Sequence, residues 1–246
     1  MKKRLLVLGL AFTMLAATAC GTSSDGGNKT SKADKTVTAT SNSDKTSETQ
    51  KDDDKKDDAK ESYKSADDIT MDDLKNHEET PADDFEYGDG PNGSIVIDGY
   101  IGEDPIVVIP NEIDGKKVVD FGRMFTNNKD VVAIKVGDNV EDIIENAFTN
   151  CDNLKYIVFG KNVKVINDGL LGGSKIEQIE FNDGLEKLGS NVSGVGLKNK
   201  IDVSIPESVT EMTFRGAKTL IVKSGSYAES YAKEYADKLG MAYKVE

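Results

Sequence analysis

Apolar residues recur at a fixed spacing along the second half of the chain. Ile134 and Val136 alternate with other residues, and the same alternation returns 23 residues later at Ile157 and Phe159. Three further pairs share this offset: Val140 and Val163, Ile143 and Ile166, and Phe148 and Leu171. A fixed period of about 20 to 50 residues is typical of stacked repeats, in which a hydrophobic core forms only between neighbouring units.

The same skeleton predicts six coils. Their starts are Val107, Ile134, Ile157, Ile179, Val203 and Leu220, at intervals of 27, 23, 22, 24 and 17 residues. Terminal repeats differ from inner ones since they close the stack against water, which fits the unequal first and last intervals. The fold class predicted for residues 94–246 is therefore a repeat solenoid.

The end of the chain predicts a cap for this solenoid. Tyr227, Tyr231 and Tyr235 lie four residues apart beside alanines, in a segment that ends at Gly240. This spacing predicts an amphipathic C-terminal capping helix, followed by a closing strand at 241–245. We expect the tyrosine stripe to pack on the open end of the stack; a sugar-binding platform is the alternative.

The beginning of the chain predicts export and lipid attachment. Basic residues precede an apolar run that is shorter than the roughly 20 residues of a spanning helix. Small residues lie directly before Cys20, an arrangement that resembles the lipobox of bacterial lipoproteins. Ala17 stands where such boxes prefer leucine, so ordinary cleavage with Cys20 left free is the alternative. We predict a lipoprotein signal peptide at 1–19 and Cys20 as the lipid attachment residue.

Two polar segments separate this signal from the solenoid. Residues 20–61 are rich in Ser, Thr, Lys and Asp, a composition that predicts a disordered tether. Residues 62–93 form an acidic approach segment, in which Thr70 could cap a short helix through Glu79. The acidic residues lack the spacing of a calcium loop, so we expect a solvated face and no metal site. Acidity also disfavours nucleic-acid binding, which needs clustered Lys and Arg.

Two stretches resemble a known family. The segments IVVIPNEIDGKKVVDFG and ENAFTNCDNLKYIVF resemble the repeats of BspA-like leucine-rich repeat surface lipoproteins of bacteria, and the resemblance covers 94–246. It is weaker in the third and fourth coils, where no cysteine recurs. The resemblance implies a leucine-rich repeat solenoid that is mainly β, with short parallel strands that form a sheet on the concave face. It also implies binding or adhesion to other proteins as the function.

Period 2 then predicts which side chains point outward from that sheet. They are Ala133, Lys135, Tyr156, Val158, Gln178, Glu180, Asp202 and Ser204. From these we select Lys135, Tyr156, Val158, Gln178 and Glu180 as candidate partner-binding residues. An exposed Tyr156 would be an aromatic anchor within a polar rim. The alternative is that these are ordinary surface residues of a sheet.

The sequence offers little for catalysis. Cys151 is predicted to be a buried structural thiol, and the sole histidine, His77, lies in the acidic segment. We find no metal-ligand cluster or glycine-rich phosphate loop, so we expect neither enzyme activity nor a cofactor. The sequence predicts a monomeric, lipid-anchored protein on the extracytoplasmic face of a bacterial cell membrane that binds a protein ligand. The alternative is a solute-binding or envelope-structural lipoprotein.

Overall fold

The computed structural model of the chain describes residues 65–189 and 201–246, which belong to one compact unit. The predicted signal peptide 1–19, its Cys20 and the linker 20–61 lie outside the described residues. Within the described part of the chain, no helix is both long and apolar enough to cross a bilayer.

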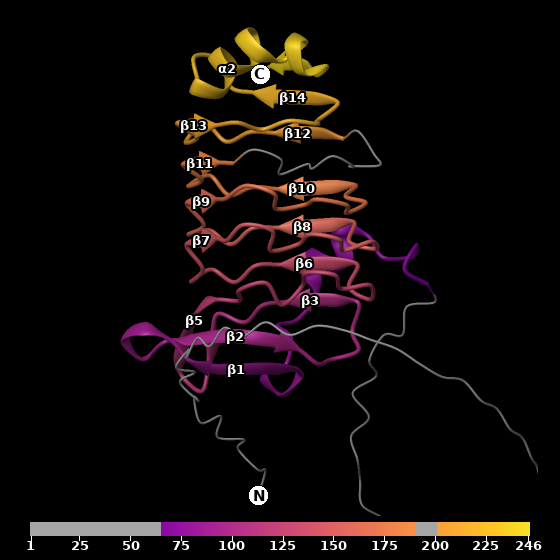
Figure 1. Ribbon diagram of the computed structural model, residues 1–246, viewed down its shortest axis with the longest axis vertical. Helices are drawn as coiled ribbons and strands as arrows, with labels where there is room; N and C mark the ends of the chain where they lie inside the picture. The colour runs from indigo at the N-terminus through magenta and orange to yellow at the C-terminus, as the bar shows by residue number, and fades with distance from the viewer. Residues whose placement is uncertain (1–64, 190–200) are drawn as a thin grey trace, which may run out of the picture. The chain divides into compact units, whose positions relative to one another are not determined.

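Stacked coils form most of the unit, and each adds one short strand to a parallel sheet (Figure 1). The first four strands are β3 (Ile106–Val108), β6 (Ala133–Lys135), β8 (Tyr156–Val158) and β10 (Gln178–Glu180). Their register places Val107, Ile134, Ile157 and Ile179 opposite one another. These are the predicted coil starts, so the solenoid and its register are confirmed.

A second parallel sheet lines the other side of the coils. It consists of β7 (Asp142–Ile143), β9 (Val165–Ile166), β11 (Lys187–Leu188) and β13 (Glu211–Met212). Ile143, Ile166, Leu188 and Met212 point inward from it and are buried. The main core therefore lies between two ladders of four short strands each.

Aromatic rings fill the core of the first coils. Phe148 is fully buried and packs against the rings of Phe121 and Phe125, with both pairs of ring centroids 5.7 Å apart. Asn127, Asn150 and Gly173 recur every 23 residues with left-handed backbone φ of 64°, 59° and 84°. Asn and Gly tolerate this conformation better than other residues, so the same corner can be repeated in successive coils.

Gly160 marks a close approach of two backbones, because a Cβ atom there would collide with the carbonyl oxygen of Gly137 in the coil before. We expect Gly160→Ala to lower the free energy of unfolding by about 1–3 kcal/mol, the usual cost of overpacking. Urea denaturation measures the change. Gly88→Ala is the control, since its Cβ would meet nothing nearer than 3.6 Å. An unchanged midpoint for Gly160→Ala would contradict this contact.

The folded unit extends into the segment predicted to be an acidic approach. Helix α1 (Met71–Asn76) begins at Thr70, whose side chain and that of Asp73 form a capping box, but it ends before the predicted Glu79. Two 3-10 turns, η1 (Ala82–Asp84) and η2 (Pro91–Gly93), flank strand β1 (Phe85–Asp89).

Strand β1 belongs to a sheet at the N-terminal end of the stack. It pairs antiparallel with β2 (Ile95–Tyr100), and the sheet continues through β5 (Lys116–Asp120) to β4 (Glu112–Ile113). The predicted domain boundary at 94 is thus too late, because β1 and α1 lie before it.

The other end of the stack is closed as the sequence predicts. Strands β12 (Asp202–Ser204), β14 (Thr219–Val222) and β15 (Ala242–Val245) form a parallel sheet, beside helix α2 (Tyr227–Tyr235) and the turn η3 (Asp237–Leu239). The tyrosine stripe is only partly a packing face. Tyr231 is buried and its hydroxyl donates to the Phe214 carbonyl at 2.9 Å, whereas Tyr227 and Tyr235 are exposed.

Candidate functional site

We call the outward-pointing side chains of the first sheet and of β12 the strand face. Its members are Ile106, Val108, Ala133, Lys135, Tyr156, Val158, Gln178, Glu180, Asp202 and Ser204. The strand face changes character along the stack. It is mainly apolar on β3, β6 and β8, and it is polar on β10 and β12. The apolar half is therefore suited to hydrophobic packing, and the polar half to hydrogen bonds and ion pairs.

Helix α1 covers the apolar half of the strand face. Met71 and Leu74 from the helix and Ile69 before it are buried against Ile106, Val108, Ala133 and Tyr156. In Figure 1 this helix is the indigo ribbon beside β6 and β8. Burying an aliphatic side chain of this size contributes about 1.5–3 kcal/mol, so the three side chains hold the helix firmly. The apolar half of the strand face is thus occupied by the chain itself.

Polar contacts fix the covering segment at both ends. At its start Lys155 donates to the Asp67 carboxylate at 2.6 Å, and at its end the Thr80 hydroxyl accepts from the Val108 N–H at 2.9 Å. The Thr80 N–H in turn donates to the Val108 carbonyl at 3.0 Å. Lys155 lowers the pKa of Asp67, through a hydrogen bond and through its charge. Asp67 therefore stays ionised and paired well below neutral pH.

This cover alters the predicted partner-binding set. Tyr156 was expected to be exposed, but it is 9% exposed and its hydroxyl donates to Glu177 at 3.1 Å. Burial, followed by that hydrogen bond, raises its pKa. The expectation of an exposed aromatic anchor is therefore wrong, because α1 lies on this ring.

The other predicted residues keep at least part of their surface. Val158 is half-buried beside the covering helix, and Lys135 is half-buried on the neighbouring strand. Glu180 pairs with Lys75 of α1, and Gln178 is exposed. The structure therefore leaves Gln178, with Asp202 and Ser204 on β12, as the open part of the strand face.

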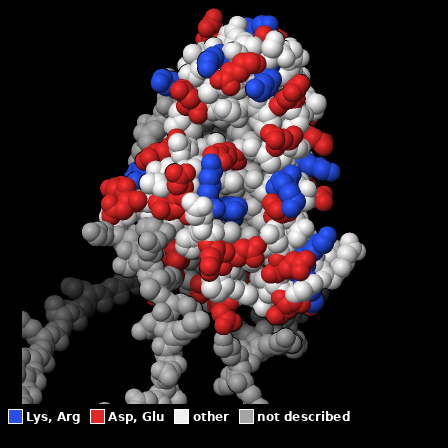
Figure 2. All heavy atoms as spheres, turned by 180° about the vertical axis from the view of Figure 1, so that it is seen from behind, with Lys and Arg blue, Asp and Glu red and all other residues white. Residues whose placement is uncertain are grey.

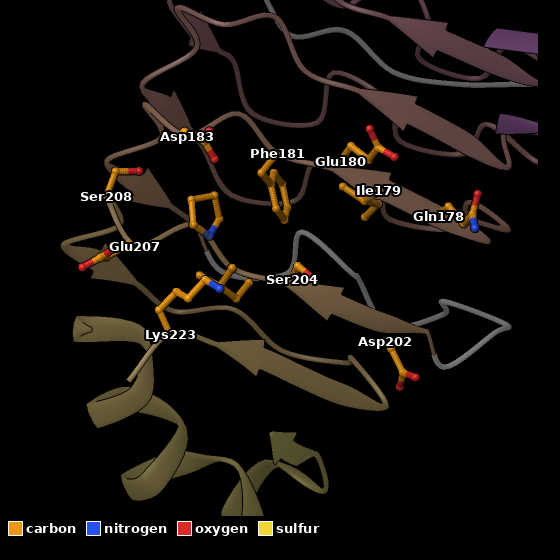
Figure 3. A pocket seen from close by; sticks show the side chains of 12 residues that line it. Gln178, Ile179, Glu180, Phe181, Asp183, Asp202, Ser204, Glu207, Ser208 and Lys223 are labelled. Carbon is orange, nitrogen blue, oxygen red and sulfur yellow. The ribbon is translucent and has the colours of Figure 1, made fainter. Parts of the chain in front are cut away.

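A cavity of about 820 Å³ lies in this open part (Figure 3). Its apolar lining includes Ile179, Phe181 and Ile205, and Lys223 extends toward Phe181 from the segment after β14. Asp183 and Glu207 lie at one end of the cavity and Gln178 and Asp202 at the other. The sequence pattern did not indicate this cavity, because it arises from an interruption between two coils.

Catalytic groups do not meet in the described residues. Cys151 is buried as predicted, its thiol donates to the Phe125 carbonyl at 2.8 Å, and burial raises its pKa to about 12. Ser174, one period later, donates to the Phe148 carbonyl at 2.9 Å in the same way. His77 lies near Asp104, with Nε2 3.6 Å from the carboxylate. Cys151 is therefore a protonated structural donor, and serine replaces it in the next coil.

Charge on the surface is mixed. On the face seen in Figure 2, carboxylates gather in several groups with Lys and Arg among them, and the coloured basic side chains there form no continuous patch. No group of three or more potential metal ligands occurs in the residues the structure describes. The whole chain has a formal net charge of −13. The described surface on this face thus lacks the clustered basic charge that a phosphate backbone requires.

Stacked coils with one short parallel strand per coil and a period near 23 residues define a leucine-rich repeat solenoid. Residues 122–218 match the family described as "BspA type Leucine rich repeat region" in six copies. Residues 122–218 of the solenoid are therefore repeats of the BspA type, as the sequence resemblance implied. No curated protein matches the chain significantly.

Solved structures include similar proteins. A leucine-rich repeat protein of T. pallidum (TpLRR) is 28% identical over 58% of this chain and 71% of its own, with a TM-score of 0.49. A leucine-rich repeat protein from Bacteroides ovatus is 20% identical over 68% of this chain and 52% of its own, with a TM-score of 0.48. The present chain thus spans about half the length of the second protein.

Proposed function

We propose that this chain is a non-catalytic, lipid-anchored surface protein that acts as a monomer and binds a protein ligand. The observation that supports this best is the divided strand face. Its apolar half is covered by α1, while the half on β10 and β12 offers exposed polar groups around a cavity that also contains apolar side chains. A mixture of polar rim and apolar centre is typical of protein interfaces. The ligand would then meet Gln178, Asp202 and Ser204, and not Tyr156.

The chemical state of Cys151 supports a binding role over catalysis. The thiol of Cys151 is protonated at neutral pH because its pKa is raised to about 12, and a thiol in that state is a poor nucleophile. The leucine-rich repeat solenoid also presents an extended surface, which suits recognition of a macromolecule.

Capture of a partner tests the proposed site. The chain after Cys20 is immobilised, and bound proteins are collected from bacterial envelope, serum and extracellular matrix. Ser204→Lys places a long side chain in the open half of the strand face, and we expect at least about tenfold less capture, a loss of roughly 1.4 kcal/mol. Thr210→Lys is the matched control, since Thr210 is an exposed hydroxyl residue next to β13 on the other sheet.

Each outcome of that capture has a separate meaning. If Ser204→Lys and Thr210→Lys retain the partner equally, the binding site does not lie on the strand face. If the unaltered chain captures nothing, a solute ligand in the cavity or an envelope-structural role becomes the better interpretation.

Anchoring is tested at Cys20, which lies outside the described residues. We expect Cys20→Ala to shift most of the protein from the membrane fraction to the soluble fraction, because stable attachment depends on acyl chains at that residue. Cell fractionation with immunoblotting measures the shift. Cys151→Ser is the control, since Ser174 shows that serine fits the equivalent position. Cys20→Ala protein that stays with the membrane would contradict the lipobox assignment.

A further inference from the structure

The strand ladder is interrupted between β10 and β12. Strand β10 ends one sheet and β12 begins another, so no ladder joins them among the described residues, whereas β11 and β13 on the other side of the same coils pair in register. The two coils are therefore joined by strand pairing on one side and not on the other. The cavity of about 820 Å³ lies at this interruption.

Core side chains are uncovered at the interruption. Ile157 and Phe159 are buried in the coil before it, but their equivalents Ile179 and Phe181 are only half-buried. Phe181 stacks on Phe159 with ring centroids 5.5 Å apart and planes inclined by 12°. One face of the Phe181 ring is thus occupied by the neighbouring coil, and the side chain also lines the cavity. An aromatic ring face attracts a cation through its quadrupole.

The charges around this ring favour a cationic ligand. Among the described residues, Glu180, Asp183, Asp202 and Glu207 line the cavity, and Lys223 is the one basic residue that does so. Lys75 pairs with Glu180, but no ion pair involves Asp183 or Glu207 among the residues that are described. Figure 3 shows Asp183 and Glu207 on the same side of the cavity, with the Glu207 side chain directed away from Phe181. The cavity thus combines the Phe181 ring with carboxylates at its edge.

We propose that the cavity between β10 and β12 receives an arginine side chain from an extended segment of the protein ligand. This inference rests on the proposed function. A guanidinium is planar, so it can stack on Phe181 while its N–H groups donate to Asp183, and Glu207 adds negative charge on the same side of the cavity. Its aliphatic stem and an adjacent apolar residue cover Ile179 and Ile205. Lys223 donates to a main-chain carbonyl of the same segment.

A peptide titration tests this assignment. The probe is acetyl-Gly-Leu-Arg-Leu-Gly-amide, and the comparison peptide has citrulline, a neutral analogue of similar shape, in place of arginine. Binding to the whole chain after Cys20 is followed through the methyl resonances of Ile179 and Ile205. We expect the arginine peptide to shift both resonances and the citrulline peptide to bind about tenfold more weakly.

Two double variants test whether the carboxylates of Asp183 and Glu207 are the ones that attract the arginine peptide. Asp183→Asn with Glu207→Gln is expected to weaken the arginine peptide about tenfold. Glu141→Gln with Asp142→Asn removes the same number of exposed carboxylates from the β7 side and is expected to leave its affinity within about twofold. The proposal is overturned if the arginine and citrulline peptides bind equally well. It is also overturned if the Asp183 and Glu207 variant binds the arginine peptide as tightly as the unaltered chain does, or if the resonances of Ile179 and Ile205 do not shift.

These results separate the inference from the proposed function. If Ser204→Lys abolishes partner capture while the Asp183 and Glu207 variant captures normally, the strand face binds a protein but not through an arginine. If the arginine peptide binds and no protein is captured, the cavity recognises cations and the proposed protein ligand is wrong.

Discussion

Replacing Phe148 by alanine is expected to lower the free energy of unfolding by about 3–5 kcal/mol, the usual cost of truncating a buried phenylalanine. The ring is fully buried and contacts both Phe121 and Phe125, which themselves pack together with centroids 6.0 Å apart. Removing it leaves a cavity that the strand ladders on both sides of the coil prevent from collapsing. Urea denaturation followed by circular dichroism measures the loss.

Tyr227→Ala is the control for that experiment, because it removes an aromatic ring that is 43% exposed on α2. We expect it to change stability by less than about 1 kcal/mol. Equal effects of the two substitutions would show that Phe148 does not occupy the centre of the coil core.

The second large effect is expected at the covering helix. Leu74→Asp places a carboxylate where a fully buried leucine contacts the strand face, and it should destabilise the docked helix by about 3–5 kcal/mol. We expect α1 to detach while the coils stay folded, since the cluster it completes is separate from the main core. Faster amide hydrogen exchange at 69–80 and increased binding of a hydrophobic dye measure the detachment.

Asn76→Asp is the matched control, because it introduces the same residue at an exposed position of the same helix. We expect it to leave both hydrogen exchange and dye binding close to those of the unaltered chain. If Leu74→Asp also leaves them unchanged, the helix is held by its polar contacts alone, through Lys155 and Thr80.

The coils could be predicted because their signal is local and repeated. The coils that contain Ile134 and Ile157 have apolar residues at equivalent positions. Because their patterns match, their strands pair in parallel and in register. The capping helix was predictable for a similar reason, since the tyrosines follow a four-residue periodicity. The helix ends at Tyr235, before the predicted Gly240, whose left-handed φ of 68° ends the 3-10 turn η3 instead. The strands of the coils and the capping helix could therefore be predicted from sequence patterns that lie within single segments.

Contacts between distant segments were not predictable in this way. Leu74 is a single apolar residue within an acidic stretch, and nothing local shows that it packs on Tyr156, 82 residues later. The apolar outward positions Ile106 and Val108 were the available signal, because an exposed strand would not present both to water. That signal identifies a covered face but not the segment that covers it.

The cavity was hidden for a different reason. Ile179 and Phe181 match the coil pattern, so the sequence predicts them to be buried like Ile157 and Phe159. Their exposure results from the missing ladder between β10 and β12, which is a property of the stacking of two coils and not of either coil alone.

The position of the covering helix also has a mechanical consequence. The described chain begins at Ser65, beside the Lys155 contact in the middle of the stack, and leads directly into α1. If the protein is held at Cys20, tension between the membrane and a bound partner reaches α1 before it reaches any coil. The helix contacts would yield first and one after another, whereas the coils resist through their strand ladders. A stretched tether would thus uncover Tyr156 and its apolar neighbours, and single-molecule pulling would record this as a small extension before the coils unfold.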